Sequence, residues 1–437
     1  MSQSSDTIYA LSSGSLPAGV AIIRISGSKA LTALSRLIGD RLPPPRQAGL
    51  RNIINSIGDV IDQALVFQFP APHSFTGEDC AELQVHGSRA VVAAVSNILD
   101  TVPDLRPAEA GEFSKRAFDN GKMDLVEVEG LADLLKAETE MQRRLAVEQS
   151  SGQLSSLYDG WANQLTRCRA LIEAELDFAD EEDIPDSVAN QVWSQVRDLE
   201  HQLSEHLRAG TGSQVIRDGF KVALVGVPNV GKSSLMNAIS GRDVAIVADV
   251  AGTTRDVLTV DLDIEGYLVT MFDTAGLRDT VDIVEREGVR RAENAAAAAD
   301  LVLMLSDNDS FPEQKFERSI FVNTKADLSV STIAVHDQLS VSSKTGFGLA
   351  KLKRAIRDRI QERVGSSSSL MPARDRHKKR LEETLNYVSE ALKSEGSELA
   401  IRSEFLRLAA TSLGRITGKV DVEDLLGIIF SEFCIGK

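Results

Sequence analysis

The sequence is poor in cysteine and in long apolar runs, and each shortage excludes a class of protein. Its 437 residues contain three cysteines, Cys80, Cys168 and Cys434, with no metal-ligand spacing between them. A sparse, odd count argues against a disulfide framework and for a reducing compartment. No apolar run approaches membrane-spanning length, and the first residues lack the basic and apolar segments of a secretion signal. We therefore expect a cytoplasmic protein without membrane contact.

Positive charge is also scarce. The chain has 48 Lys and Arg residues against 64 Asp and Glu residues, so its net charge is −16 and its pI is near 5. An acidic chain is a poor general surface for nucleic acid, so any RNA contact requires a local basic patch. The only dense basic run is Arg374–Arg380. We interpret this run as a solvated helix face, with an RNA contact as the less favoured alternative.

One segment that is present has the pattern of a phosphate-binding loop. Gly226–Ser233 reads Gly-Val-Pro-Asn-Val-Gly-Lys-Ser and lies between a strand-like run, Val222–Val225, and a helix-like run, Leu235–Ile239. This order of strand, glycine loop and helix is the context that such a loop requires. Its glycines allow backbone N–H groups to face phosphates, while Lys232 would reach the terminal phosphates and Ser233 would bind Mg²⁺.

Three further motifs follow in the order expected of a GTPase. Asp273-Thr-Ala-Gly276 ends a strand-like run, where its carboxylate could hold the Mg²⁺ shell and its glycine could meet the γ-phosphate. Gly252–Asp256 offers Thr254 as a second hydroxyl for the metal. Thr324–Asp327 and Ser342–Lys344 each follow an apolar run and would read a guanine base, with the Asp327 carboxylate accepting two hydrogen bonds. The predicted GTP-binding residues are Asn229, Val230, Gly231, Lys232, Ser233, Ser234, Ala248, Asp249, Val250, Ala251, Gly252, Thr253, Thr254, Asp273, Thr274, Ala275, Gly276, Thr324, Lys325, Asp327, Ser342, Ser343 and Lys344.

Two groups common in GTPases are missing. Leu277 stands where Ras-like GTPases place the Gln that orients water, and no arginine finger from an activator is evident. A monovalent cation could supply the missing positive charge. Asn229 and oxygens of Ala248, Val250 and Thr253 could form a cage sized for K⁺, which predicts hydrolysis faster in K⁺ than in Na⁺. Alternatively, Asn229 only stabilises the loop backbone.

The remainder of the chain flanks this region. Residues 1–120 contain three β-like runs and a helix-like run, Arg89–Leu99, which predicts an α+β domain. Two polar segments there, Ser74–Asp79 and Pro107–Asp124, are interpreted as solvated loops. Helical spacing runs from Leu125 to Leu207, with Gly210–Gly212 expected to end it, and resumes after residue 369. The predicted fold is therefore a multidomain α+β and α/β protein: an N-terminal α+β domain (1–120), a discontinuous helical domain (121–215 and 370–437), and an inserted Ras-like P-loop GTPase domain (216–365).

The last residues, Phe433-Cys-Ile-Gly-Lys437, place a cysteine fourth from the end of the sequence. The final Gly and Lys are wrong for prenylation, and no polybasic segment precedes them. We reject a lipid anchor. A Cys and a Lys in this place could instead reach into a neighbouring pocket.

Over its full length the chain resembles the MnmE (TrmE) family of tRNA modification GTPases. The matching segments are Arg24-Ile-Ser-Gly27, Ser74–Asp79, Gly111-Glu-Phe-Ser114, Gly252–Asp256, Asp273–Arg278 and Phe433–Lys437. The resemblance implies that the N-terminal domain binds tetrahydrofolate and forms a homodimer. By match of motif, Arg24, Glu82 and Lys122 would contact the folate and Lys437 would complete the pocket.

The resemblance also implies a reaction. With a flavoprotein partner, MnmG (GidA), that carries FAD, such proteins add an aminomethyl or carboxymethylaminomethyl group to C5 of the tRNA wobble uridine, using a folate one-carbon unit. Glu285 matches the family's candidate for positioning water, and the K⁺ site would close when two GTPase domains meet. Cys434 would be a nucleophile or base, or else a small apolar residue of the last helical turn. One departure is Thr324, where Asn is usual.

Other functions remain open from the sequence. The chain could be a GTP-switch ribosome-assembly or RNA-binding factor whose N-terminal domain only docks RNA. It could also be a helical scaffold with an inactive GTPase. Tight binding of reduced folate to residues 1–120 would separate a tRNA-modifying enzyme from the assembly or RNA-binding factor. A helical scaffold would show no nucleotide turnover.

Overall fold

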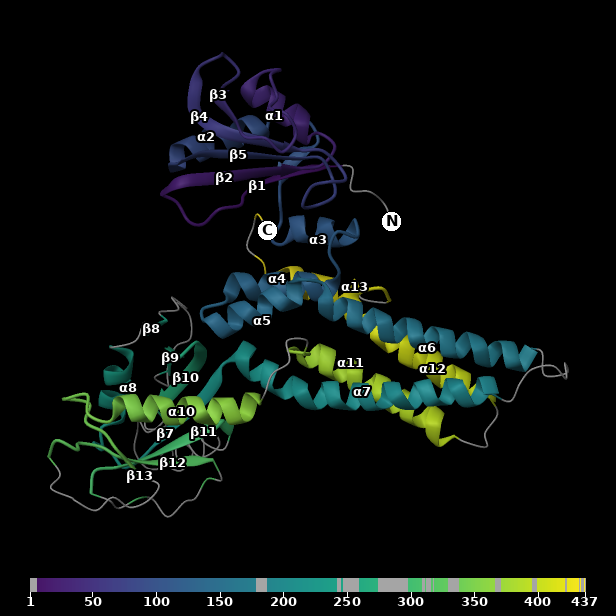
Figure 1. Ribbon diagram of the computed structural model, residues 1–437. Helices are drawn as coiled ribbons and strands as arrows, with labels where there is room; N and C mark the ends of the chain where they lie inside the picture. Colours follow the sequence, from purple (N-terminus) through teal and green to yellow (C-terminus); the bar gives the residue numbers. More distant parts are fainter. Residues whose placement is uncertain are drawn as a thin grey trace, which may run out of the picture. The chain divides into compact units, whose positions relative to one another are not determined.

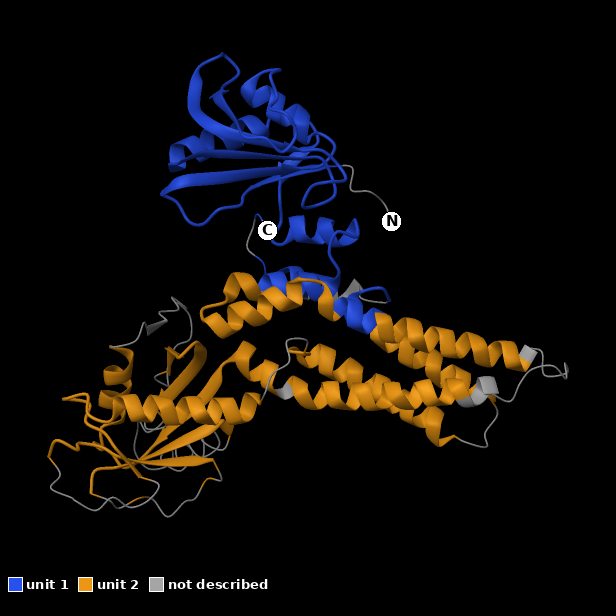
Figure 2. Ribbon diagram, in the orientation of Figure 1, with its two compact units in different colours: residues 1–132, 155–159, 414–437 blue, residues 133–154, 160–413 orange. Residues whose placement is uncertain are grey.

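The computed structural model describes residues 6–177, 187–241, 245–246, 259–273, 298–308, 311, 316, 318–328, 338–365, 371–394, 399–420, 423–431, 433 and 436. The chain divides into two compact units, coloured separately in Figure 2. Unit 1 comprises residues 1–132, 155–159 and 414–437, and unit 2 comprises residues 133–154 and 160–413. Helices α4, α6 and α12 each contribute residues to both units. The four domain boundaries expected from the sequence therefore stay predictions.

Unit 1 contains a six-stranded mixed sheet with the strand order β3-β4-β5-β2-β1-β6 (Figure 1). Its strands are β1 (Thr7–Leu11), β2 (Ala18–Ser26), β3 (Gly49–Ile54), β4 (Val60–Phe69), β5 (Cys80–Gly87) and β6 (Leu105–Pro107). Alternate residues point to opposite faces. One face, including Ile23, Ile25 and Leu83, is buried under helices α1 (Ala30–Ile38) and α2 (Arg89–Leu99). The predicted α+β pattern of this region is confirmed.

The opposite face of this sheet is only partly covered. Helix α3 (Glu112–Asp119) packs Phe113 against Ile8 and Ala10 of β1. A second small core joins the start of α4 (Leu125–Lys136) to α13 (Glu423–Ser431), with Phe430 near Phe118 of α3 at 6.5 Å between ring centroids. Residues more than 300 positions apart in the sequence thus share one core in unit 1.

Unit 2 contains the helices α5 (Glu140–Ser150), α7 (Ser187–Asp218) and α11 (Asp375–Lys393), and most of α6 (Gln153–Asp177) and α12 (Leu399–Thr417). A capping box of Thr139 and Gln142 starts α5. The prediction that Gly210–Gly212 ends the helical region is wrong, since α7 continues to Asp218. A Cβ atom on Gly210 would clash with Pro372, and one on Gly212 with the Val364 carbonyl. These glycines allow close packing within a continuous helix.

Unit 2 also contains a seven-stranded sheet with the order β13-β12-β11-β7-β10-β9-β8. Its strands are β7 (Phe220–Val225), β8 (Ala245–Ile246), β9 (Thr259–Ile264), β10 (Tyr267–Asp273), β11 (Leu301–Ser306), β12 (Ser319–Asn323) and β13 (Gln338–Ser340). The five strands from β13 to β10 are parallel. Parallel sheets are covered on both faces, and β11 is accordingly buried at every residue. The strands and the helix predicted around the nucleotide motifs are present.

Helices α8 (Lys232–Ser240) and α10 (Leu349–Val364) contribute to the core of this sheet. The same core includes Leu145 of α5 and Ile216 of α7, so these two helices are packed onto the sheet. The backbone N–H of Met141 also donates to the carbonyl of Gly266 in the β9–β10 turn. None of the helices formed by the described residues is both long enough and apolar enough to cross a membrane.

Candidate functional site

The predicted phosphate loop joins β7 to α8 by a backbone that turns twice into the left-handed region. Asn229 has φ 62° and Gly231 has φ 104°; asparagine and glycine are the residues that tolerate such values most readily. The Lys232 ammonium donates to the carbonyls of Gly226 at 2.9 Å and Val227 at 3.1 Å. Lys232 is therefore held across the loop, where a terminal phosphate could take up its hydrogen bonds.

Ser233 and Asp273 form the second part of the site. Asp273 ends β10, which pairs with β7 so that Asp273 stands opposite Leu224. The Ser233 hydroxyl lies 3.4 Å from a carboxylate oxygen of Asp273, which is buried. Hard oxygen atoms of this kind suit Mg²⁺, which keeps several waters and shares phosphate oxygens. Within the described ranges, no cluster of three or more His, Cys, Asp or Glu side chains forms a separate metal site.

Thr324 connects the base-reading motif to the phosphate loop. Its hydroxyl donates to the Val230 carbonyl at 2.6 Å and lies 3.1 Å from the Ser306 carbonyl. The residue that departs from the family's usual Asn thus braces the loop directly. Lys325, at φ 54°, pairs with Asp307 at 2.7 Å. Asp307 was not predicted from the sequence as a site residue. Its position directly after the strand β11 was the one feature that could have indicated it.

Asp327 is oriented by Ser342. The Ser342 hydroxyl donates to a carboxylate oxygen of Asp327 at 2.6 Å, and this bond holds the pKa of Asp327 below its usual value. The backbone N–H of Ala326 donates to the Val341 carbonyl, which ties the two base-reading motifs together. An ionised carboxylate can only accept hydrogen bonds, as recognition of the guanine N1–H and amino group requires. Phosphate and base motifs therefore gather at the carboxyl ends of β7, β10, β12 and β13, where ligands bind in open α/β sheets.

Several predicted residues lie outside the described residues. They are Ala248, Asp249, Val250, Ala251, Gly252, Thr253, Thr254, Thr274, Ala275, Gly276, Leu277, Glu285, Cys434 and Lys437. The K⁺ cage, the second Mg²⁺ hydroxyl, the water-positioning carboxylate and the terminal thiol consequently stay predictions.

Two of the predicted folate residues, Arg24 and Glu82, lie together on the partly covered face of the six-stranded sheet. Arg24 of β2 and Glu82 of β5 are direct cross-strand partners, joined at 2.8 Å. The Arg24 guanidinium lies 5.1 Å from the ring centroid of Phe75 and 5.7 Å from that of Phe113. Lys122 lies beside Gly77, since a Cβ atom there would meet its side chain at 3.2 Å. Arg24 and Lys122 are thus brought to one loop, Ser74–Asp79.

This loop is anchored by a polar network around Thr76, so the interpretation of Ser74–Asp79 as a solvated loop is wrong for this residue. Thr76 is fully buried and lies 2.6 Å from the Ser26 hydroxyl, which also donates to Glu78 at 2.7 Å. Arg116, only 4% exposed, is bonded to Glu78, Asp6 and Glu112 at 3.0–3.2 Å.

The same network fixes the charge on Glu112. Burial of Glu112 opposes its ionisation, but hydrogen bonds from Arg106, Glu109 and Arg116 hold its pKa below the usual value. The segment 107–124 therefore supplies fixed charges beside the folate residues.

The C-terminal segment approaches the same region of unit 1. Gly436 has φ 99°, and a Cβ atom on it would clash with the Leu11 carbonyl at the end of β1. Gly111, at φ 67°, makes a similar close approach to the Phe430 carbonyl. Leu11 pairs with Ile23, the neighbour of Arg24. The backbone next to Lys437 is thus seated at the edge of strands that carry the folate residues.

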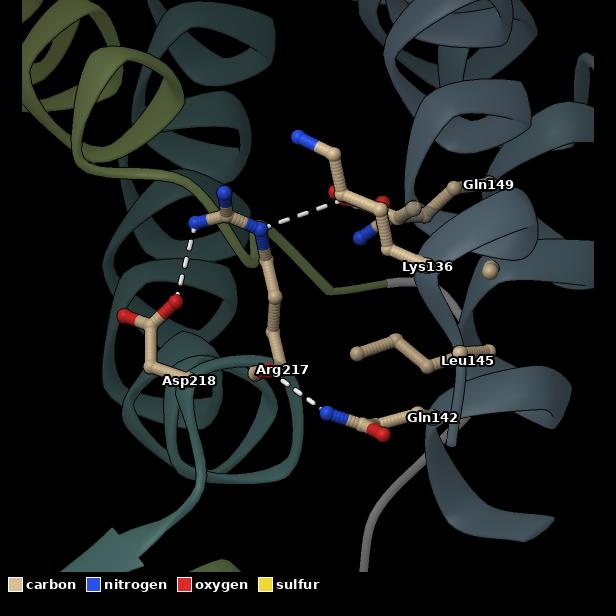
Figure 3. Close-up of a pocket in the computed structure, with 9 residues that line it drawn as sticks. Lys136, Gln142, Leu145, Gln149, Arg217 and Asp218 are labelled. Atoms are coloured by element: carbon tan, nitrogen blue, oxygen red, sulfur yellow. Dashed lines mark hydrogen bonds and ion pairs between the residues drawn. The ribbon is translucent and has the colours of Figure 1, made fainter. Parts of the chain in front are cut away.

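In unit 2, ion pairs connect three helices beside a pocket (Figure 3). Asp133 accepts from Arg217, near the end of α7, at 3.2 Å and from Arg374, before α11, at 2.7 Å. Gln142 donates to the Arg217 carbonyl beside a cavity of about 130 Å³. Because Arg374 is largely buried and His377 is fully buried, the interpretation of 374–380 as a solvated face is wrong for these two residues.

Comparisons with known proteins agree with this geometry. Residues 7–122 match the family model of the GTP-binding protein TrmE N-terminus, and residues 125–434 match that of the MnmE helical domain. The tRNA modification GTPase MnmE of Agrobacterium fabrum is 66% identical over 442 residues, covering all of both chains. The proteins of the same name from Rhizobium etli and Brucella ovis are 55% and 49% identical, over 100% and 99% of this chain and 100% and 98% of their own lengths.

Proposed function

The chain belongs to the MnmE family of tRNA modification GTPases, and from this premise we propose that it hydrolyses GTP in the modification of tRNA wobble uridines. One observation supports the GTPase part above all others. Lys232, the Ser233–Asp273 pair and the Asp327–Ser342 pair lie at one edge of one sheet, in the roles of phosphate, metal and base recognition. No generic phosphate loop requires the base-reading pair.

We propose that Mg²⁺ binds Ser233 and Thr254 with the phosphates, and that K⁺ binds Asn229, Ala248, Val250 and Thr253. The left-handed backbone at Asn229 supports this assignment, because it turns the loop sharply beside the phosphate position. A cation there would offset the negative charge that spreads over the phosphates in the transition state. Glu285 would orient the attacking water.

We propose that tetrahydrofolate binds between Arg24, Glu82, Lys122 and Lys437 and supplies a one-carbon unit. The half-buried ring of Phe75 lies beside the Arg24 guanidinium, so the region offers an apolar ring together with charged hydrogen-bond groups. The residues fit a planar heterocycle with donor and acceptor edges. Cys434 would act as nucleophile or base in the transfer.

The partners that we propose are a second copy of the chain, an FAD-carrying MnmG (GidA) flavoprotein and tRNA, in the cytoplasm. The homodimer is supported by exposed apolar residues on the same face as Arg24. Leu50 of β3 is 57% exposed and is the cross-strand partner of Leu65, 41% exposed, while Val20 of β2 is 53% exposed. Exposed apolar patches on strands typically mark protein interfaces.

The test is mass spectrometry of wobble uridines in tRNA from cells that lack this protein. We expect the C5 modification to be lost and to return with the full-length chain. Intact modification would refute the assignment to tRNA modification. GTP hydrolysis by a chain that does not bind folate would instead favour a ribosome-assembly or RNA-binding factor.

The cation proposal has a separate test. GTP turnover is measured in K⁺ and in Na⁺ for the parent and for Asn229→Ala. We expect K⁺ to stimulate the parent strongly and the variant weakly. Equal parent rates in both salts would refute the K⁺ site, whatever the variant does.

A further inference from the structure

A second pocket lies at the edge of the seven-stranded sheet opposite the nucleotide motifs. Phe220, Leu301 and Ser319, the first residues of β7, β11 and β12, line it together with the last turns of α10. Its volume is about 220 Å³. Because these strands are parallel, this edge lies about 20 Å, a strand's length, from the phosphate loop. The pocket is therefore distinct from the GTP site.

Three arginines converge on this pocket: Arg318 from the residue before β12, and Arg359 and Arg363 from α10. Two acidic residues also line it, and both are engaged. Glu362 pairs with Arg359 at 2.9 Å, and Asp300 accepts the backbone N–H of Lys221 at 3.0 Å. Within the part of the chain that the structure describes, Arg318 and Arg363 make no ion pair or hydrogen bond through their side chains.

Local stability explains only part of this arrangement. A cation in the last turn of a helix interacts favourably with the helix dipole, which accounts for Arg363. Arg318 precedes a strand and gains nothing from that dipole. The lining contains three arginines and two carboxylates, so it carries a net positive charge that an anion in the hollow would offset.

Because the chain has a net charge of −16, binding of an anion requires a local cluster of cations. The basic run 374–380 is less available to an anion, since Arg374 pairs with Asp133 and Arg380 pairs with Glu383. Among the described residues, in contrast, Arg318 and Arg363 have no side-chain partner. A guanidinium binds phosphate in a bidentate manner that lysine does not reproduce.

We propose that Arg318, Arg359 and Arg363 bind a backbone phosphate of the tRNA. This inference rests on the proposed function, because tRNA is the phosphate-rich partner which that function requires. Such a contact would position the RNA and strengthen its binding without reading its sequence. It would also place RNA on the unit that hydrolyses GTP, at the edge away from the nucleotide.

The experiment compares full-length parent with the double variant Arg318→Gln/Arg363→Gln. Binding of fluorescently labelled tRNA is measured by anisotropy between 50 and 200 mM KCl, a range in which phosphate contacts change affinity strongly. We expect the variant to bind about tenfold more weakly at the lowest salt. We also expect the slope of log K against log salt to become shallower by about one to two, as the loss of one or two phosphate contacts requires. GTP turnover without tRNA should be unchanged.

The matched control is Lys351→Gln/Arg354→Gln, which removes the same charge from exposed positions of the same helix outside the pocket. Equal loss in both variants would mean that net charge, and not the pocket, governs binding, and would overturn the proposal. An unchanged affinity in the pocket variant would do so too. A parent that fails to bind tRNA at all would refute the proposed function together with this site.

A calorimetric titration with inorganic phosphate distinguishes the other source of the ligand. Phosphate binding that disappears in the pocket variant, while tRNA affinity stays at the parent value, would assign the pocket to a free phosphorylated molecule and overturn the RNA assignment. Loss of tRNA affinity, with phosphate competing against tRNA in the parent alone, would support it.

Discussion

The two sheets of this protein present their binding groups in different places. On the seven-stranded sheet the groups lie in loops beyond the strand ends, where Lys232, Asp327 and their partners follow β7 and β12. On the six-stranded sheet Arg24 and Glu82 lie within two neighbouring strands as cross-strand partners. A loop can change its conformation without disturbing the sheet, whereas a cross-strand pair is part of the sheet. We therefore expect the first site to move during its cycle and the second to be preformed.

The largest effect should come from Lys232→Ala. Its ammonium is the cation that the phosphate loop holds in place, so its loss should lower GTP turnover on the order of a thousandfold. The variant should keep the folate affinity and the unfolding temperature of the parent, because the two sites use separate sheets. Lys221→Ala, in the same sheet, is the control and should retain turnover. A parallel loss of folate binding would contradict the independence of the two sites.

Asp327→Asn should follow in size. An amide donates where the carboxylate accepts, so two hydrogen bonds to guanine are lost, roughly 3 kcal/mol or about a hundredfold in GTP affinity. Affinity for xanthosine triphosphate should rise in exchange. Asp307→Asn removes the same charge at the same sheet edge and should cause no exchange. Nucleotide competition measures both, and unchanged preference in Asp327→Asn would mean that the base is read elsewhere.

On the six-stranded sheet, Arg24→Met should weaken folate binding about tenfold, the effect of losing one charged hydrogen bond. The methionine keeps an apolar stem beside Phe75 and Phe113. GTP turnover should be unaffected, and Arg51→Met on β3 serves as the matched control. Equilibrium dialysis with reduced folate gives the affinity. Equal folate affinity in Arg24→Met and parent would remove Arg24 from the site.

The smallest effect expected is that of Thr324→Val. It deletes the hydroxyl that bonds the Val230 carbonyl, at a cost of about 1 kcal/mol, or about fivefold in GTP affinity. Thr324→Ser keeps the hydroxyl and should stay close to the parent. If both variants bind GTP equally well, the brace between the base-reading motif and the phosphate loop has no energetic role.

Residues of the candidate site on the seven-stranded sheet were easier to predict from the sequence than those on the six-stranded sheet. The reason is that the first group lies in loops after strands, whereas the second group is paired across strands. Phosphate and base motifs are short contiguous segments after strands, so residues such as Lys232 and Asp327 could be assigned individually. The pair Arg24–Glu82 depends on strand register across 58 residues, and the family resemblance was needed to find it. Arg116 was missed altogether, because two of its three carboxylate partners, Asp6 and Glu78, come from distant parts of the chain.

The helix end predicted at Gly210 and Gly212 was wrong for a specific physical reason. Gly210 and Gly212 were expected to end a helix because glycine disfavours helical backbone. In α7 the lack of side chains allows Pro372 and Val364 to approach, and the packing gained there outweighs the weak local preference. A helical prediction from composition alone contains no information about what will pack against it.

The assembly of unit 1 has a consequence for how the protein is made. Residues 1–132 leave the ribosome well before residues 414–437, which complete the same unit through Phe430 and Gly436. At ordinary rates of synthesis the 281 intervening positions require roughly 15 to 60 s. During that interval Phe118, Leu125 and Val128 lack their partners on α13. The nascent N-terminal region therefore has this apolar surface uncovered until the C-terminal residues are made, and we expect a chain that ends before α13 to leave it exposed.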